Sequence, residues 1–232
     1  MKQLPLGIRL RDFAVFESFY AGPNAAAVAH LEKMATGEHR EPAVWLWGPA
    51  ATGKTHLLQA VCAAAGERGL ESGFLPLDQA AEFSAELLDG WGDLRVVCLD
   101  NLQYVAGETE WEQSLFRLFN QLNESAGTLI VAGDASPAAT RFKLKDLASR
   151  LSWGSVFQLH PLTEPERIQA LQLRAVQRGL ELPDETCWYL LRRHARDMNS
   201  LYNLLDTLDT ESMAEQRKLT VPFVKKVLGT DK

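Results

Sequence analysis

The sequence predicts an α/β protein in which a parallel five-stranded sheet lies between helices, followed by a small C-terminal domain made only of helices. Two observations lead to this fold class. Five short β-rich segments alternate with helical segments, and the first of them runs directly into a complete phosphate-binding loop, or P-loop. After Pro161 the segments read as helices with polar or proline starts, and no strand pattern returns.

The predicted strands are short runs of mostly apolar residues, which is typical of strands that are buried on both faces of a parallel sheet. They cover residues 43–47, 73–77, 95–99, 128–132 and 155–159. The helices predicted after the sheet cover residues 164–178, 183–194, 197–215 and 220–228. We therefore expect a tail at residues 1–8, an α/β nucleotide-binding domain at 9–162 and a helical domain at 163–232.

Composition excludes several classes of protein. The chain has 232 residues, of which 46% are hydrophobic and 23% charged, as in an ordinary soluble globular protein. The net charge of −6 argues against a protein that binds duplex DNA by neutralising phosphates. Because no apolar run reaches membrane-spanning length and the N-terminus lacks a signal-peptide core, we expect a cytoplasmic protein without membrane contact. Cys62, Cys98 and Cys187 are expected to be buried free thiols.

The P-loop reads Gly-Pro-Ala-Ala-Thr-Gly-Lys-Thr over residues 48–55. Its glycines allow backbone N–H groups to turn inward around a polyphosphate, while Lys54 reaches the terminal phosphates and the Thr55 hydroxyl is placed to hold Mg²⁺. Residues 54–66 then form a helix whose positive N-terminus faces the anion. His56 either approaches the nucleotide or lies on a helix face, and both interpretations stay open. The predicted phosphate-binding residues are Gly48, Pro49, Ala50, Ala51, Thr52, Gly53, Lys54 and Thr55.

Polar residues follow two further predicted strands. Asp100 ends the third strand, where an acid next to a P-loop is placed to hold Mg²⁺; the alternative is that it caps the next helix. Asn101 follows it, and an amide cannot act as a base toward attacking water. Asp134 follows the fourth strand, where it either orients water or senses the γ-phosphate, or is a turn residue before Pro137.

Arg150 lies in the segment Asp-Leu-Ala-Ser-Arg-Leu-Ser-Trp-Gly, residues 146–154, ahead of the last predicted strand. Two interpretations are open. Arg150 is either a surface arginine in an ion pair or an arginine finger offered to the γ-phosphate of another subunit. The second interpretation supplies positive charge to the transition state that a P-loop alone leaves uncovered.

The P-loop, Asp100, Asp134, the segment around Arg150 and the helices after it together resemble the AAA+ module of the bacterial initiator DnaA. The resemblance extends from about Phe16 to the C-terminus. It implies an AAA+ P-loop domain, a helical lid domain and a bound adenine nucleotide together with Mg²⁺. Because Asn101 and the lid are poorly equipped for hydrolysis, we expect ADP to be favoured, with ATP the alternative.

Residues 16–24, Phe-Glu-Ser-Phe-Tyr-Ala-Gly-Pro-Asn, resemble the adenine-side segment of this family, which implies that Phe19, Tyr20 and Asn24 contact the nucleotide. In the lid, Asn199 and Thr207 occupy the positions where the family carries a sensor arginine, and Arg196 nearby is a candidate substitute. We therefore expect very slow intrinsic hydrolysis.

The tail contains Gln3-Leu4-Pro5-Leu6, which resembles the short peptide that partners of the replicative sliding clamp use. Gln3 would hydrogen-bond at a polar rim, and Leu4 and Leu6 would fill an apolar cleft while Pro5 stiffens the peptide. The alternatives are a disordered tail or the first segment of the core. We also expect no helix-turn-helix domain after the lid, where the initiator carries one.

This combination resembles the regulatory inactivators of DnaA within the family. The resemblance implies two partners, DnaA and the sliding clamp, with DNA reached indirectly through the clamp; a homo-oligomeric state is left open. It further implies that Arg150 acts in trans on ATP bound to DnaA. Two rival functions are a free-standing ATPase or loader, which strong turnover by the chain alone would favour, and a DNA-binding replication adaptor, which tight, salt-sensitive duplex binding would favour.

Overall fold

The computed structural model describes residues 14–193, 197–215 and 217–229. These residues form two compact units, one made of residues 14–19 and 23–160 and the other of residues 20–22 and 161–229. The predicted tail at residues 1–8 and Arg196 lie outside the described residues. Among the helices of the described part, none combines the length and apolar character needed to cross a membrane.

The first unit contains the predicted parallel sheet of five strands, which confirms this part of the fold class. The strand order is β2-β3-β4-β1-β5, and all neighbouring strands run parallel. The carboxyl ends of all five strands therefore meet at one edge of the sheet. The strands are β1 Ala43–Trp47, β2 Ser72–Pro76, β3 Val96–Asp100, β4 Thr128–Gly133 and β5 Ser155–Gln158.

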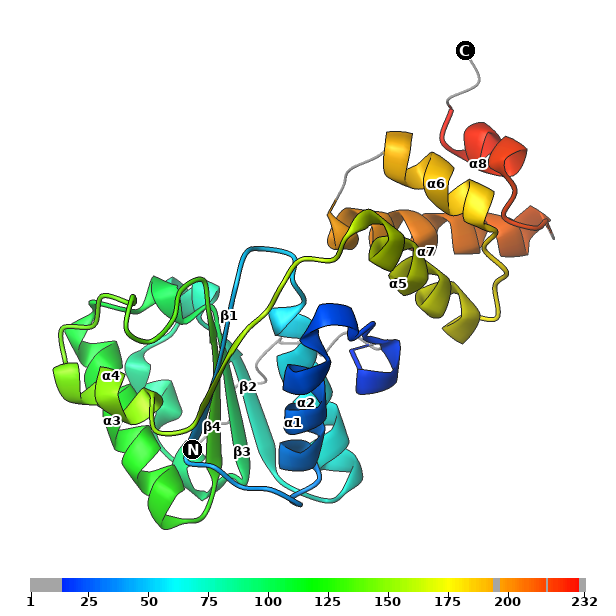
Figure 1. Cartoon of the computed structure of the whole chain (residues 1–232). Coiled ribbons are helices and arrows are strands. Elements are labelled where there is room, and N and C mark those ends of the chain that lie inside the picture. The colour runs from blue at the N-terminus through cyan, green and yellow to red at the C-terminus, as the bar shows by residue number, and fades with distance from the viewer. Residues whose placement is uncertain (1–13, 194–196, 216, 230–232) are drawn as a thin grey trace. The chain divides into compact units, whose positions relative to one another are not determined.

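Helices cover both faces of this sheet, as Figure 1 shows. Helices α1 (Ala25–Ala35) and α2 (Lys54–Glu67) lie on one face, and α3 (Thr109–Glu124) and α4 (Lys145–Leu151) lie on the other. Successive strand residues point to opposite faces, so near-continuous burial of β1, β3 and β4 follows from this two-sided cover. The short 3₁₀ helices are Phe16–Ser18, Gly22–Asn24, Leu77–Glu82, Ala85–Leu88, Trp91–Asp93 and Leu102–Tyr104.

The core beneath α3 and α4 is centred on Trp45 of β1, which is only 1% exposed. It belongs to a cluster that includes aliphatic residues of the neighbouring strands and of both helices, and its indole N–H donates to the carbonyl of Ala135, 2.9 Å away. This bond satisfies the one polar atom of a buried tryptophan and fixes the turn after β4. The three cysteines are buried free thiols, as predicted.

The second unit is helical, as predicted, and has a core of its own. The largely covered side chain of Arg178 joins α5 to α7 through Asp206 at 2.6 Å and Asp209 at 3.4 Å. At the start of α5, the Glu166 carboxylate accepts a hydrogen bond from the Thr163 N–H at 2.7 Å, which satisfies one unpaired donor of the first turn. The helices are α5 Glu164–Gln177, α6 Asp184–Arg193, α7 Met198–Glu215 and α8 Val221–Val227.

The turn before β5 depends on a residue without a side chain. A Cβ atom on Gly154 would lie 1.7 Å from the carbonyl oxygen of Ala43 in β1. Any side chain there would push β1 and β5 apart at the point where their pairing begins.

We expect Gly154→Ala to lower the free energy of unfolding by about 1–3 kcal/mol, because the added methyl overlaps backbone that cannot rotate away. The matched control is Gly66→Ala in α2, where an added Cβ meets nothing within 4 Å. That control should raise stability by about 0.5–1 kcal/mol, since alanine favours the helix. Urea unfolding of both variants measures the difference, and equal stability of the two would contradict the close approach at Gly154.

Candidate nucleotide site

The P-loop connects β1 to α2 at the carboxyl edge of the sheet, and two of its positions require glycine because a side chain there would clash. A Cβ on Gly48 would lie 2.4 Å from the Leu159 carbonyl oxygen. Gly53 has φ +93°, and a Cβ there would lie 2.4 Å from the ring of Phe19. Ala51 holds a left-handed conformation, with φ +61°, that glycine adopts more readily. The Thr52 hydroxyl donates to the Pro49 carbonyl at 3.0 Å and closes the loop internally.

Lys54 stabilises the loop from its C-terminal side. Its ammonium donates to the carbonyl oxygens of Gly48 at 2.7 Å and Pro49 at 2.9 Å. An ammonium has three donors, and these carbonyls take two of them. Burial lowers the pKa of Lys54, while the negative charges of Asp100 and Asp134 raise it and offset part of that effect. Lys54 is thus a positive charge held at the mouth of the loop, next to the carboxyl ends of β3 and β4.

Thr55 and Asp100 meet across the carboxyl edge of the sheet. The Thr55 hydroxyl donates to Asp100 Oδ2 at 2.5 Å, and the Asn101 N–H donates to Oδ1 at 2.9 Å. Asp100 is only 1% exposed, and this burial raises the pKa of its carboxyl, against the lowering effects of Thr55, Asn101 and Lys54. A hydroxyl and a carboxylate are the hard oxygen ligands that suit Mg²⁺ beside nucleotide phosphates, so the donor set fits that ion. Bound there, Mg²⁺ would neutralise phosphate charge.

Asn101 and Asp134 flank this pair. Asn101 lies in the left-handed region with φ +59°, a conformation that asparagine tolerates better than most residues. The backbone conformation thus favours asparagine at this position, in addition to the chemical difference between an amide and a carboxylate. Asp134 is exposed directly after β4, and its negative charge lies close enough to Lys54 to raise the pKa of that ammonium. The turn and the site interpretations of Asp134 are compatible, because the same turn brings its carboxylate near Lys54.

The segment before α1 packs over the P-loop. The Phe19 ring lies against Gly53 and, with ring centroids 5.4 Å apart, against His56. His56 Nε2 lies 2.9 Å from the Val15 carbonyl oxygen and 3.2 Å from the Ser18 hydroxyl. His56 thus lies on the first turn of α2 and ties the segment of Phe19 to the loop.

The other two predicted adenine-side residues have different surroundings. Asn24 is buried, and its amide exchanges two hydrogen bonds with the backbone of His160, donating to the carbonyl at 3.0 Å and accepting from the N–H at 2.8 Å. Both ends of this amide are engaged in joining the start of α1 to the chain after β5. Tyr20 belongs to the second unit, where its hydroxyl donates to Gln169 Oε1. In the same unit Asn199 and Thr207 are exposed on α7.

Arg150 lies in the last turn of α4, away from these residues. Its guanidinium lies over the ring of Phe116 at 4.7 Å, over Trp153 at 5.2 Å and over Phe119 at 5.8 Å. It also donates to Asn120 Oδ1. Within residues 14–193, 197–215 and 217–229 no carboxylate pairs with it, so the ion pair considered from the sequence is not found there; aromatic rings hold the cation instead.

Glu112 is a positioning residue that the sequence analysis missed. It is 1% exposed, and its carboxylate accepts from the backbone N–H groups of Gly107 at 2.7 Å, Lys143 at 3.0 Å and Leu144 at 2.7 Å. These bonds fix the chain that enters α4, and so the helix that carries Arg150. One feature of the sequence could have indicated this role: Glu112 is a carboxylate on the apolar stripe of a predicted helix, one turn from Leu115.

Solved structures share this fold. Domain III of the replication initiation protein DnaA from Thermotoga maritima matches with a TM-score of 0.77 and 21% identity, covering 96% of this chain and 98% of that one. AMPPCP-bound DnaA from Aquifex aeolicus matches with a TM-score of 0.71 and 23% identity over 90% of this chain and 70% of that one. The RuvB Holliday junction branch migration motor of Thermotoga maritima is more distant, with a TM-score of 0.64 and 15% identity over 90% and 68%.

Two family models match the two units. The model of the bacterial DnaA ATPase domain matches residues 10–158, more than half of the chain, and the model of the Hda lid domain matches residues 164–228. Both matches are consistent with Hda, a DnaA-related AAA+ protein, and together they support a DnaA-related replication regulator. The chain belongs to the AAA+ family of bacterial DnaA ATPase domains, and its C-terminal unit is a lid domain of the Hda type.

Proposed function

We propose that this protein is a negative regulator of replication initiation that stimulates hydrolysis of ATP bound to DnaA. In this proposal Arg150 is a trans arginine finger, the P-loop holds an adenine nucleotide with Mg²⁺, and Gln3-Leu4-Pro5-Leu6 binds the DNA-loaded sliding clamp. The protein acts in the cytoplasm and reaches DNA through the clamp. The Hda-type lid next to a DnaA-type ATPase domain supports this proposal.

The position of Arg150 is the observation that carries the proposal. The P-loop follows the carboxyl end of β1, whereas Arg150 lies in the helix that leads to the amino end of β5. Because β1 and β5 pair in parallel, these two points lie at opposite ends of strands about 16 Å long. The contacts of Arg150 with Phe116, at the middle of α3, and with Asn120, in the half of α3 that leads toward β4, agree with this arrangement. A γ-phosphate that Arg150 reaches therefore belongs to another subunit.

The surroundings of Arg150 also suit a finger. Aromatic rings and one amide oxygen orient the guanidinium without neutralising it, so its charge remains available to a phosphate. An exposed cation–π contact is worth about 0.5–1 kcal/mol, which a phosphate contact easily replaces. An arginine finger accelerates phosphoryl transfer by about 10³–10⁵-fold, or roughly 4–7 kcal/mol of barrier.

The protein's own nucleotide has a structural role in this proposal. Lys54, Thr55 and Asp100 are arranged to hold phosphates and Mg²⁺, while Asn101 offers no base to activate water. We propose ADP as the resident nucleotide, with ATP the alternative and hydrolysis by the chain alone very slow. The AMPPCP-bound DnaA of similar fold supports an adenine nucleotide. Multiple turnovers per minute by the purified chain would instead favour the free-standing ATPase.

Replacing Arg150 separates a finger from a structural arginine. We expect Arg150→Ala and Arg150→Lys to lower the stimulated hydrolysis of DnaA-bound ATP by about 10³-fold or more, since lysine lacks the planar fork. Nucleotide binding and clamp binding should persist. The control is Arg141→Ala, an exposed arginine ahead of the same helix, which should keep full stimulation. Full stimulation by Arg150→Ala, or a joint loss of melting temperature and every activity, would reject the finger.

The tail gives a second test. We expect the double variant Gln3→Ala with Leu4→Ala to lose measurable clamp binding in surface plasmon resonance, because both the polar and the apolar anchor are removed. The melting temperature should not change if the tail adds little to the fold. Arg9→Ala, outside the four residues, is the control. Clamp affinity equal to that of the unaltered protein would reject the tail assignment and leave the finger untouched.

Asp100→Asn tests whether Asp100 is a magnesium ligand. The variant should lose the Mg²⁺ dependence of nucleotide binding while the free protein becomes more stable. Burial raises the pKa of Asp100 above 3.8, so the ionised carboxylate disfavours the folded state as pH rises beyond that value. We expect the variant to melt higher than the unaltered protein at pH 7 without nucleotide, and this gain to shrink as pH falls toward 3.8. Its ADP affinity should no longer depend on Mg²⁺. Asp93→Asn, an exposed control, should change neither property; retained Mg²⁺ dependence in Asp100→Asn would contradict the assignment.

A further inference from the structure

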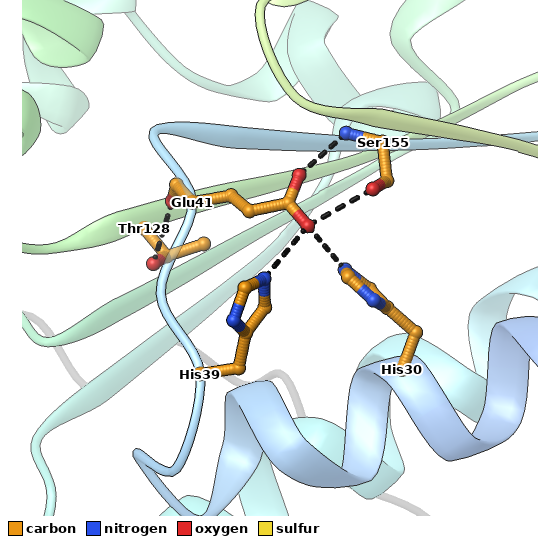
Figure 2. Close-up of polar contacts among 5 residues, drawn as sticks. All are labelled: His30, His39, Glu41, Thr128 and Ser155. Atoms are coloured by element: carbon orange, nitrogen blue, oxygen red, sulfur yellow. Dashed lines mark hydrogen bonds and ion pairs between the residues drawn. The ribbon is translucent and has the colours of Figure 1, made fainter.

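Two imidazoles and a carboxylate converge in one cluster, as Figure 2 shows, and this cluster lies at the amino edge of the sheet, whereas the P-loop lies at the carboxyl edge. His30 lies on α1, while His39 and Glu41 lie in the connection from α1 to β1. One ligand atom of each residue lies within 4.8 Å of the others. We propose that His30, His39 and Glu41 form a binding site for a divalent transition-metal ion, with Zn²⁺ the best-suited ion.

The distances between the donor atoms suit a shared ion. Glu41 Oε1 lies 2.6 Å from His30 Nε2 and 3.2 Å from His39 Nε2. His30 Nε2 is buried, and its approach to Glu41 does not have hydrogen-bond geometry. In a tetrahedral zinc site, bonds of about 2.0–2.2 Å place two ligand atoms about 3.4 Å apart. The two distances that end at Glu41 differ from this separation by less than about 1 Å, and the two imidazole nitrogens, at most 4.8 Å apart, would have to approach each other by no more than about 1.4 Å.

The surrounding structure holds Glu41 in place. Its carboxylate accepts hydrogen bonds from the N–H and the hydroxyl of Ser155, at 2.5 and 2.9 Å, and the Thr128 hydroxyl donates to its backbone carbonyl at 2.9 Å. Gly154 allows this approach, because a Cβ there would lie 2.7 Å from Glu41 Oε2. Such bonds to a ligand from outside the metal shell orient it and tune its affinity for the metal.

Packing also limits the movement of one of the two imidazoles. The His30 ring packs against Phe157 with centroids 5.1 Å apart, which limits its rotation away from Glu41.

The donor set selects the kind of ion. Imidazole nitrogens suit Zn²⁺, Co²⁺, Ni²⁺ and Cu²⁺, whereas Mg²⁺ prefers oxygen ligands only. Three protein ligands leave a fourth tetrahedral position for water. The cluster lies before the amino ends of β1, β4 and β5, and the Thr55 and Asp100 pair lies at the carboxyl edge, so the two cation sites are separate.

Zinc titration of the purified full chain tests the proposal. After chelator treatment and its removal, isothermal titration with ZnCl₂ in the presence of excess Mg²⁺ and ADP should show one saturable site. His39→Ala and the double variant His30→Ala with His39→Ala should weaken zinc affinity by at least about tenfold and about a hundredfold. His39 is 48% exposed, so its single variant should keep the fold. His160→Ala, which removes an exposed imidazole elsewhere, is the matched control and should leave affinity unchanged.

Cobalt substitution identifies the ligands independently. Co²⁺ at the site should give the visible absorption of a tetrahedral nitrogen and oxygen shell, and His39→Ala should lose it. A thiolate charge-transfer band would assign the ion to a cysteine instead and overturn the proposal. So would the absence of a saturable zinc site, or zinc affinity in His39→Ala equal to that of His160→Ala. In those cases the three side chains form only an ion-pair network.

Discussion

The parallel pairing of β3, β4 and β1 is the constraint on which the candidate nucleotide site depends. Residues that are far apart in sequence, Lys54, Asp100 and Asp134, come together only because their strands end at the same edge. The hydrogen bond from Thr55 to Asp100 then joins the P-loop helix to β3. The carboxylate of Asp100 is buried, and burial opposes its ionised form. The packing of helices on both faces of the sheet supplies the stability that offsets this cost.

The same pairing separates functions between the two edges of the sheet. The carboxyl edge carries the P-loop and its acidic neighbours, and the amino edge carries His39, Glu41 and the turn at Gly154. Arg150 belongs to the second group through its contacts with Asn120 and Trp153. The function proposed above requires such a separation, since an arginine finger must face outward from the phosphates of its own subunit.

The sequence was sufficient to predict elements whose signals are local. The five strands were predicted within one residue at each end, because buried parallel strands are short apolar runs, and the P-loop was evident from its spacing. Tertiary contacts were out of reach. Neither the convergence of His30 with Glu41 nor the three backbone donors on Glu112 has a local pattern, since the partners are brought together by folding. The aromatic rings around Arg150 come from two helices and were equally hidden.

The two bonds between Ser155 and Glu41 affect how freely Arg150 moves. Ser155 is anchored at the first residue of β5, and only residues 151–154 separate it from Arg150. On the other side, Glu112 anchors Lys143 and Leu144 just before α4. The segment that carries Arg150 is therefore a short tether, fixed at one end by the buried carboxylate of Glu112 and at the other by the partly exposed carboxylate of Glu41. In the function proposed above, the backbone of this segment would lose little conformational entropy on docking, because folding has already removed most of it.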